Sequence, residues 1–349
     1  MAIVKSDAYG HGLIEVSKTL INEGVGFLGV SEVEEAVSLR NAGITVPIML
    51  LSGLAHGAEK EILDFDLIPG IGDDRTLNSL EKAAKTANKA KQVHIKIDTG
   101  MGRLGFSPER ALKIFEHRTK WPHLIFSGIY SHLAASDDPK DPFTLRQLEK
   151  FSTFLKTLEG RQSLPQIIHL ANSGGLINFP QTHFSIVRPG LALYGAYPGI
   201  AAKDRIKLRP VMSFSSEIIS VHNRKAGSPV SYGHTYYTKR ESVIAVVPVG
   251  YDDGYLRALS NKAEVLVHGK RCPVVGRICM KALMIDVTDV QDVVSGDKVM
   301  LLGKQKQEEI TIEMLASWAN TISYELMCLL GTRNQRTFKE AKNVWDRAS

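Results

Sequence analysis

Lys5 stands near the start of the chain, between a short apolar run and a turn rich in glycine. Residues 2–4, Ala-Ile-Val, predict a buried strand, and Gly-His-Gly at 10–12 predicts a turn before the helical spacing that follows. The carboxyl end of such a strand is where α/β proteins build their sites. A lysine held there among apolar neighbours can lose its proton and form a Schiff base with an aldehyde, whereas most lysines stay solvated and charged. The lysine alone leaves both interpretations open.

Two later loops carry residues suited to binding a phosphate. They have the sequences Ala-Asn-Ser-Gly-Gly at 171–175 and Arg-Pro-Gly-Leu at 188–191. Glycine lets backbone N–H groups approach an anion, serine adds a hydroxyl, and the start of a following helix is positive. Either loop alone is explained by a turn and a helix cap at Asn172 or Ser173. Both loops together, in register with Lys5, favour a phosphate-bearing aldehyde, pyridoxal 5'-phosphate (PLP).

The first 208 residues alternate short apolar strands with helical segments, and this alternation must position these loops. A capping-box spacing from Ser31 to Glu34 predicts a helix that runs to Gly43, and another helix is expected between Asp73 and Lys91. Eight strand-then-helix units predict a (β/α)8 barrel. A doubly wound open sheet would also alternate, but no G-x-G-x-x-G follows the first strand. We expect strands at 2–4, 26–30, 47–52, 67–71, 93–98, 124–132, 166–170 and 184–187.

The pattern changes near residues 207–210, after which alternating polar and apolar residues predict strands. We therefore expect a barrel at 1–208 and a mainly β domain at 209–349. The second domain closes with helices near 312–320 and 324–330, the latter ended by Gly331. The predicted strands of this domain are 214–219, 243–249, 264–268, 284–287 and 298–302.

The composition excludes several classes of protein. The chain has 349 residues, 44% of them hydrophobic and 23% charged, as in an ordinary globular protein. Its net charge of +6 is spread without a basic block, so we expect no nucleic-acid partner. The apolar runs are far shorter than the roughly 20 residues that span a membrane, and the charged amino terminus predicts no secretory signal. Three cysteines without metal-type spacing favour a reducing cytoplasm and no metal site.

Two longer segments, VKSDAYGHG at 4–12 and VRPGLALYG at 187–195, contain Lys5 and the second loop. They are similar to the PLP-lysine motif and the cofactor-binding segment of the alanine racemase family, which the chain resembles over nearly its whole length. The resemblance implies that Arg188 contacts the pyridine nitrogen of PLP and that His132 packs near the ring, where a core histidine is the alternative. It implies phosphate contacts from Tyr9, Ser173, Gly190, Leu191 and Tyr324. An arginine keeps its proton at neutral pH, so the pyridine nitrogen stays unprotonated and the ring is a weaker electron sink, which suits a racemase better than a decarboxylase.

Further similar segments imply substrate and proton-transfer residues. KIDTGMGRLG at 96–105 implies that Arg103 lies beside the substrate carboxylate. In some relatives the lysine at the position of Lys96 is carbamylated and braces the arginine; an ordinary structural lysine is the alternative. VSYGHTY at 230–236 implies that Tyr232 is the second catalytic base. A tyrosine acts as a base at neutral pH only beside positive charge, for which Arg188 and His132 are the candidates.

Two more segments of the β domain complete the resemblance. VGYDDG at 249–254 places Tyr251 near the substrate, and GRICMK at 276–281 implies that Met280 offers its backbone N–H to the substrate carboxylate. Lys281 departs from the family, where an aspartate is usual, and this charge reversal bears on substrate preference. The family also normally carries another strand and helix before the lysine motif. We therefore expect either a start codon set too late or a truncation.

The resemblance implies a PLP-dependent alanine racemase in a bacterial cytoplasm, supplying D-alanine for peptidoglycan. Lys5 and Tyr232 would act on opposite faces of the substrate in a two-base mechanism. In the family the β domain of one subunit completes the barrel site of the other, so a homodimer with shared active sites is expected. The alternatives are a broad-specificity or serine racemase of the same fold, and a non-enzymatic PLP-binding homeostasis protein; the latter class lacks the β domain.

Overall fold

The computed structural model describes residues 1–53 and 57–339 and divides the chain into two compact units. The first unit contains residues 1–9 and 13–211, and the second contains residues 10–12 and the chain from 212 onward. Each unit is described here by itself. The prediction of an α/β barrel followed by a mainly β part is confirmed.

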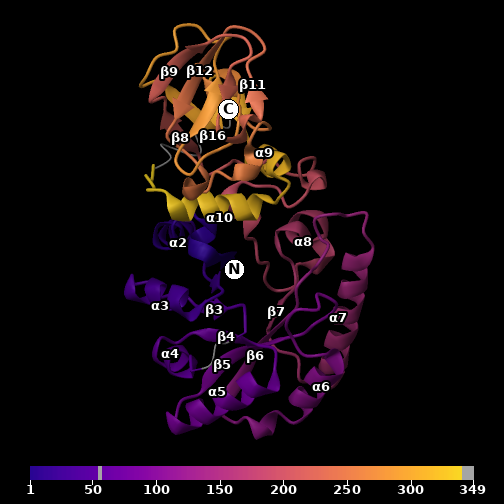
Figure 1. Cartoon of the computed structure of the whole chain (residues 1–349). Coiled ribbons are helices and arrows are strands. Elements are labelled where there is room, and N and C mark those ends of the chain that lie inside the picture. The colour runs from indigo at the N-terminus through magenta and orange to yellow at the C-terminus, as the bar shows by residue number, and fades with distance from the viewer. Residues whose placement is uncertain (54–56, 340–349) are drawn as a thin grey trace. The chain divides into compact units, whose positions relative to one another are not determined.

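The first unit is built on a parallel sheet of seven strands whose order in space follows the sequence. Helices surround these strands, as Figure 1 shows for α3 to α7. The strands are β1 (Ala2–Ile3), β2 (Leu28–Val30), β3 (Ile48–Leu50), β4 (Ile68–Ile71), β5 (Lys91–Lys96), β6 (Leu124–Tyr130) and β7 (Ile167–His169). The helices are α1 (Lys5–Tyr9), α2 (Leu13–Asn22), α3 (Val33–Asn41), α4 (Glu59–Asp64), α5 (Asp74–Thr86), α6 (Pro108–Glu116), α7 (Phe143–Gly160) and α8 (Ser173–Asn178).

The predicted eighth strand at 184–187 is wrong, yet this segment still closes the barrel. Phe184 has a φ of +42°, which interrupts extended backbone, and no regular ladder forms. The segment instead makes single hydrogen bonds to both edge strands of the sheet. Backbone N–H of Ser185 donates to the Ile168 carbonyl of β7 at 3.0 Å, and N–H of Ile3 in β1 donates to the Pro189 carbonyl at 3.0 Å. The chain thus occupies the place of an eighth strand without its regular geometry.

The helices near the predicted caps begin as expected or one residue later. Asp73 caps α5 by accepting a hydrogen bond from N–H of Thr76 at 2.8 Å. The predicted capping box from Ser31 is wrong, because the N-cap of α3 is Glu32. The Glu35 carboxylate accepts the N–H groups of Ser31 and Glu32, at 3.0 and 3.2 Å. A carboxylate that receives two N–H groups satisfies donors that the helix start leaves unpaired.

The second unit is mainly β, and the five strands predicted for it are all present. Strands β9, β12 and β15 form one sheet, β8, β13, β14, β16 and β17 another, and β10 pairs with β11. The strands are β8 (Phe214–Glu217), β9 (Ser220–Arg224), β10 (Pro229–Val230), β11 (Tyr236–Tyr237), β12 (Ser242–Val247), β13 (Glu264–Val267), β14 (Lys270–Pro273), β15 (Leu283–Asp286), β16 (Lys298–Gln305) and β17 (Glu308–Ile310). All pairings in this unit are antiparallel.

Two helices, α9 (Ile312–Ala319) and α10 (Ser323–Arg333), end the described part of the second unit. The prediction that Gly331 ends the second helix is wrong, because α10 continues to Arg333. A Cβ at Gly331 would lie 1.9 Å from the carbonyl oxygen of Gly10. The glycine therefore lets the backbone of α10 pack directly against the backbone at Gly10. Close packing, not helix termination, explains the residue.

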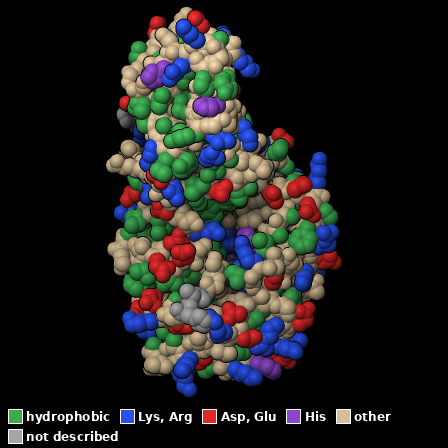
Figure 2. Space-filling model, in the orientation of Figure 1, with side chains coloured by type: hydrophobic (Ala, Val, Ile, Leu, Met, Phe, Trp, Pro, Cys, Tyr) green, Lys and Arg blue, Asp and Glu red, His purple; other side chains and the backbone are tan. Residues whose placement is uncertain are grey.

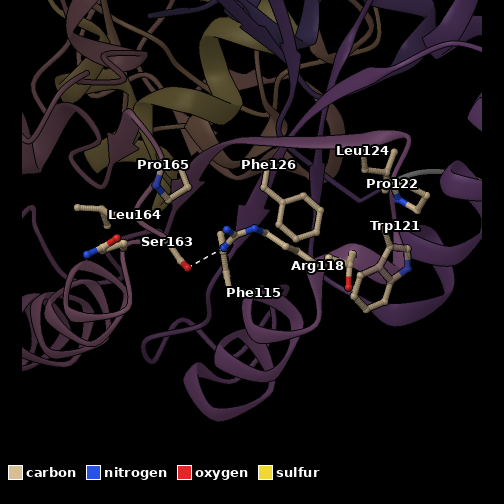
Figure 3. A pocket seen from close by; sticks show the side chains of 11 residues that line it. Phe115, Arg118, Trp121, Pro122, Leu124, Phe126, Ser163, Leu164 and Pro165 are labelled. Atoms are coloured by element: carbon tan, nitrogen blue, oxygen red, sulfur yellow. Dashed lines mark hydrogen bonds between the residues drawn. The ribbon is translucent and has the colours of Figure 1, made fainter.

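A surface hollow lies away from the predicted site. A hollow of about 360 Å³ opens at the amino ends of β6 and β7, where Arg118 donates a hydrogen bond to the Ser163 hydroxyl at 2.6 Å (Figure 3). This is the opposite end of the strands from Lys96 and Arg188.

Lys and Arg side chains are interspersed with Asp and Glu over the face shown in Figure 2. Of the helices in the described ranges, none combines the length and apolar character that a membrane span requires.

Candidate active site

Lys5 begins a left-handed helical turn at the carboxyl end of β1. Residues 6 to 9 have φ values of 53°, 54°, 53° and 54°, although none is glycine. Each residue in this conformation costs roughly 1–2 kcal/mol, so the turn stores strain. Two hydrogen bonds hold it: N–H of Ala8 donates to the Val4 carbonyl at 2.8 Å, and Asp7 accepts the N–H of Leu13 at 2.7 Å. The turn keeps Lys5 and Tyr9 at the same end of the barrel.

Four positive side chains surround His132 at this end of the barrel. Burial, followed by the charges of Arg188, Arg103, Lys96 and Lys5, lowers the pKa of His132 to about 3. The prediction that His132 supplies positive charge is therefore wrong, because its imidazole is neutral at physiological pH. The same surroundings act on Lys96, whose pKa is lowered to about 8 by burial and then by Arg103, Arg188 and Lys5.

Three of these cations, Lys96, Arg103 and Arg188, form no ion pair with a carboxylate in the part of the chain that the structure describes. Such a cluster attracts anions, because like charges that repel one another are stabilised by a bound opposite charge. A phosphate and a carboxylate are the groups that this end of the barrel suits.

Arg188 is the most buried of the four, with 4% of its surface exposed. One terminal nitrogen, Nη2, donates to the carbonyls of Ser131 and Leu170, at 2.7 and 3.0 Å. The other, Nη1, lies 2.9 Å from Nδ1 of His169. Burial lowers the pKa of Arg188 to about 10, so the guanidinium remains protonated at neutral pH. These contacts use three of its five N–H groups and leave two for a ligand with a lone pair.

The two predicted phosphate loops meet at Ser173. Its hydroxyl oxygen accepts the N–H groups of Gly190 and Ala192, at 3.0 and 3.2 Å. A Cβ at Gly190 would lie 2.4 Å from the hydroxyl oxygen of Tyr9, so only glycine fits there without a shift. Leu191 follows in the same turn. Four of the predicted phosphate residues are thus brought together within the first unit.

Asn172 and Asp98 organise the loops that carry these residues. Asn172 caps α8 by accepting the N–H of Gly175 at 2.9 Å, so the capping interpretation holds for this residue while Ser173 faces the second loop. Asp98 accepts the N–H groups of Gly100 and Gly102, at 2.8 and 2.9 Å, and so shapes the exposed turn that bears Arg103. The sequence contains a signal for the role of Asp98, because an aspartate before a Gly-x-Gly turn commonly accepts local backbone N–H groups.

The second unit gathers Tyr232, Tyr251 and Met280 through three neighbouring loops. N–H of Tyr251 donates to the Cys279 carbonyl, and N–H of Asp252 donates to the Met280 carbonyl, each at 3.1 Å. Ser231, next to Tyr232 and held at a φ of +65°, donates its hydroxyl to the Arg277 carbonyl at 2.5 Å. The three predicted side chains are 70%, 39% and 57% exposed, so they are available to a partner molecule.

Lys281 pairs with the acidic residues that follow Tyr251. Its ammonium lies 2.5 Å from Asp253 and 2.9 Å from Asp252, and Arg333 lies 3.7 Å from Asp252. The hydrogen bond to Asp253 is the first cause that raises the pKa of Lys281. The lysine therefore ties the loop of Met280 to the turn of Tyr251. Tyr324 lies in the first turn of α10, 37% exposed.

Comparison with known proteins identifies the family of the chain. The family described as "Alanine racemase, N-terminal domain" matches residues 1–198, and "Alanine racemase, C-terminal domain" matches residues 211–338. Alanine racemases of Halothermothrix orenii and Syntrophobacter fumaroxidans are 40% and 41% identical over 339 residues, which are 97% of this chain and 89% and 90% of theirs.

Solved structures give the same result. The alanine racemase of Streptomyces lavendulae is 34% identical with a TM-score of 0.90, covering 95% of this chain and 88% of its own. That of Bartonella henselae, described with covalently bound pyridoxal phosphate, is 32% identical with a TM-score of 0.86, covering 96% and 91%. Because both family models match and the relatives are about 40% identical over nearly the whole chain, the chain belongs to the alanine racemase family.

Proposed function

We propose that this protein is a PLP-dependent racemase that interconverts L- and D-alanine. The observation that carries the proposal is the buried guanidinium of Arg188, which has two N–H groups left over and shares the electrostatic surroundings of Lys5. An arginine that cannot give up its proton suits an unprotonated pyridine nitrogen. A carboxylate there would favour a protonated ring and other reactions of amino acids.

The residues of the first unit fit PLP chemically. Ser173, Gly190, Leu191 and Tyr9 would hold the phosphate through a hydroxyl, backbone N–H groups and a phenol, and Lys5 would hold the aldehyde carbon covalently. When bound, the cofactor supplies a ring that accepts electron density from the substrate Cα. His132, neutral at physiological pH, would pack against the ring without adding a charge.

Lys5 and Tyr232 would transfer the protons of the reaction. Racemisation removes a proton from one face of Cα and returns one to the other. A lysine tethered beside the cofactor cannot easily reach both faces, so a second base is needed. Arg103 and the backbone N–H of Met280 would hold the substrate carboxylate, and Tyr251 would lie beside it.

The two sets of residues belong to different units of the chain, which supports a homodimer with shared sites. In this proposal the barrel at 1–208 binds the cofactor, and the domain at 209–349 of the second subunit supplies Tyr232. Such an enzyme would act in a bacterial cytoplasm and supply D-alanine for peptidoglycan. Tyr324, on the second unit, would add a further phosphate contact.

The test begins with borohydride reduction of the purified protein, peptide mapping and a racemisation assay on a panel of L-amino acids. We expect the cofactor on Lys5 and alanine as the preferred substrate. Lys5→Ala should lose the covalent cofactor. Cofactor fixed to another lysine, or no racemisation of alanine by the loaded enzyme, would contradict the proposal.

Tyr232→Phe tests the second base. We expect this variant to retain PLP while racemisation falls roughly a hundredfold or more, the usual range for losing a general base. The resemblance to the family implies that the lysine takes the proton from D-alanine and the tyrosine takes it from L-alanine. Solvent-hydrogen exchange at Cα should therefore persist with D-alanine and largely vanish with L-alanine. Equal loss of exchange for both enantiomers would exclude two separate bases.

Subunit exchange tests the shared sites. Mixing the Lys5→Ala and Tyr232→Phe dimers should produce heterodimers in which one site carries both defects and the other carries neither. Activity should reappear. Two inactive parents that stay inactive after proven exchange would place both residues in the site of one subunit.

A further inference from the structure

Arg188 is the first member of a buried chain of three hydrogen-bonded side chains. His169, at the end of β7, presents Nδ1 to Nη1 of Arg188 at 2.9 Å. Its Nε2 lies 2.8 Å from Nδ1 of His94, on β5. Both histidines are fully buried, and no carboxylate takes part in the chain.

The proton positions in this chain follow from the arginine. A guanidinium only donates, so Nδ1 of His169 must accept and carries no hydrogen. Burial, followed by the charge of Arg188, lowers the pKa of His94 to about 4 and the pKa of His169 well below its ordinary value. Both rings are therefore neutral at physiological pH, with one N–H each. His169 must carry its hydrogen on Nε2 and donate it to Nδ1 of His94, which places the hydrogen of His94 on Nε2.

The outer nitrogen of His94, Nε2, does not explain why a histidine occupies this position. Nε2 is buried and has no hydrogen-bond partner among the described residues, and an unpaired buried donor destabilises the fold. The ring lies over Gly128, where a Cβ would come within 2.6 Å of it, and its centroid is 6.1 Å from that of Phe27. A phenylalanine would fill this apolar space without an unpaired donor. The imidazole is thus explained by its inner nitrogen, the acceptor for His169.

We propose that His94 is a positioning residue: it accepts the Nε2–H that Arg188 imposes on His169 and so holds that imidazole, and through it the guanidinium of Arg188, in position. Without an acceptor at position 94, the Nε2–H form of His169 has a buried N–H without a partner. The Nδ1–H form instead directs its N–H toward an N–H of Arg188, and the two donors repel each other. The ring of Tyr130 stacks on His169, with centroids 4.9 Å apart and planes within 2° of each other. This stacking restricts tilting of the imidazole, so His169 cannot avoid either conflict by rotating.

The proton positions are a property of this chain alone, whereas their effect on racemisation rests on the proposed function. If Arg188 faces the pyridine nitrogen, a guanidinium that is poorly held should bind PLP less tightly and control the reaction less well. The two consequences are measured separately.

The first experiment is ¹⁵N NMR of histidine-labelled protein, with and without PLP, using long-range ¹H–¹⁵N correlations that distinguish the two neutral forms. The signals are assigned by their loss in single-histidine variants. We expect His169 and His94 both to carry hydrogen on Nε2 in the native protein. In His94→Phe, the Nε2–H of His169 loses its acceptor, so its ¹H and ¹⁵N signals should shift, or divide between the two neutral forms. A native His169 with hydrogen on Nδ1, or an unchanged His169 in the variant, would overturn the proposal.

The second experiment compares His94→Phe with His94→Asn, whose amide oxygen can replace the acceptor. His123→Phe is the matched control, since His123 is a half-buried histidine bonded to Glu81 at the amino end of β6, outside the site. We expect His94→Phe to weaken PLP binding and lower kcat roughly tenfold, the effect of leaving the buried N–H of His169 without its acceptor, with a smaller change in KM. The asparagine should restore most of this loss, and the control should change neither.

The outcomes separate the two proposals. A native protein with the expected proton positions but no alanine racemisation would reject the proposed function and keep the role of His94. An active enzyme in which the phenylalanine and asparagine variants lose kcat and PLP affinity equally would reject the role of His94, because a packing defect alone would then explain the loss. Thermal unfolding of each variant measures that defect directly.

Discussion

Replacing Lys96 with methionine should stabilise the folded protein at neutral pH. Lys96 is 6% exposed at the end of β5, and its ammonium is 3.4 Å from the Leu51 carbonyl and 5.1 Å from the centre of the Tyr130 ring. These two contacts are weak compared with the loss of water and the repulsion by neighbouring cations. Methionine keeps the length of the side chain and removes the charge.

The size of the effect follows from the lowered pKa of Lys96, about 8 in the folded protein against 10.5 ordinarily. Below pH 8 the folded protein must protonate the buried amine, which lowers the free energy of unfolding by about 3 kcal/mol at about pH 7. Between pH 8 and 10.5 the unfolded chain binds a proton that the folded protein does not. The free energy of unfolding of the native protein therefore rises with pH in this window, by about 2 kcal/mol from about pH 7 to about pH 9.5. The lost contacts should reduce the gain of the variant at neutral pH to roughly 1–2 kcal/mol.

Urea denaturation at fixed protein concentration, at about pH 7 and about pH 9.5, measures this difference. We expect Lys96→Met to be the more stable protein at the lower pH and to lose most of its advantage at the higher one. A difference that does not change with pH would refute the reasoning, whatever its size. Lys91→Met is the control: Lys91 is as buried but is paired with Asp66, so its loss should destabilise the protein.

Reaction with carbon dioxide is another way to remove the positive charge of Lys96 in the native protein. A pKa of about 8 leaves a fraction of the amine neutral at physiological pH, and carbamylation would turn a positive charge into a negative one beside Arg103. We expect ¹³C-bicarbonate to give a carbamate signal that is absent in Lys96→Met. Bicarbonate should also remove the pH dependence of the native protein; a dependence that persists beside a carbamate signal would contradict this account.

Three further predictions concern the cofactor and substrate loops. Gly190→Ala places a Cβ 2.4 Å from the Tyr9 hydroxyl oxygen and should weaken PLP binding at least tenfold, as measured by titration of the cofactor-free protein. Lys281→Ala leaves Asp252 and Asp253 without their lysine and should raise KM for alanine more than it lowers kcat; the reverse pattern in steady-state kinetics would contradict this. Removing PLP should lower the thermal midpoint, and inorganic phosphate should restore part of the loss when compared with chloride at equal ionic strength.

The barrel was predictable because its strands are short apolar runs separated by clear turns. The segment at 184–187 failed because a left-handed residue such as Phe184 leaves no mark in a pattern of polar and apolar residues. Gly331 was taken for the end of a helix, since glycine is common there, but its reason is contact with a backbone distant in sequence. Both errors concern tertiary contacts that a local pattern does not contain.

The site was predictable where parallel strands bring their ends together, as for Lys5 and Arg188. The left-handed turn at 6–9 was not, because four consecutive residues without glycine rarely adopt that conformation. His169 was overlooked although it lies on a strand predicted to be buried, where a histidine needs partners. The neutral state of His132 could not be predicted, because its pKa depends first on burial and then on four cations from separate segments of the chain.

Electrostatic repulsion among the cations explains the role of the buried histidines. Lys5, Lys96, Arg103 and Arg188 repel one another, and the fold supports them with neutral acceptors: carbonyls of Ser131 and Leu170 for Arg188, and imidazole nitrogens behind it. Neutral acceptors orient a guanidinium without cancelling its charge. A carboxylate in place of His169 would stabilise the empty barrel, but it would also reduce the attraction that this end of the barrel exerts on a phosphate or a carboxylate. The histidine chain therefore keeps the arginine both fixed in position and able to attract an anion.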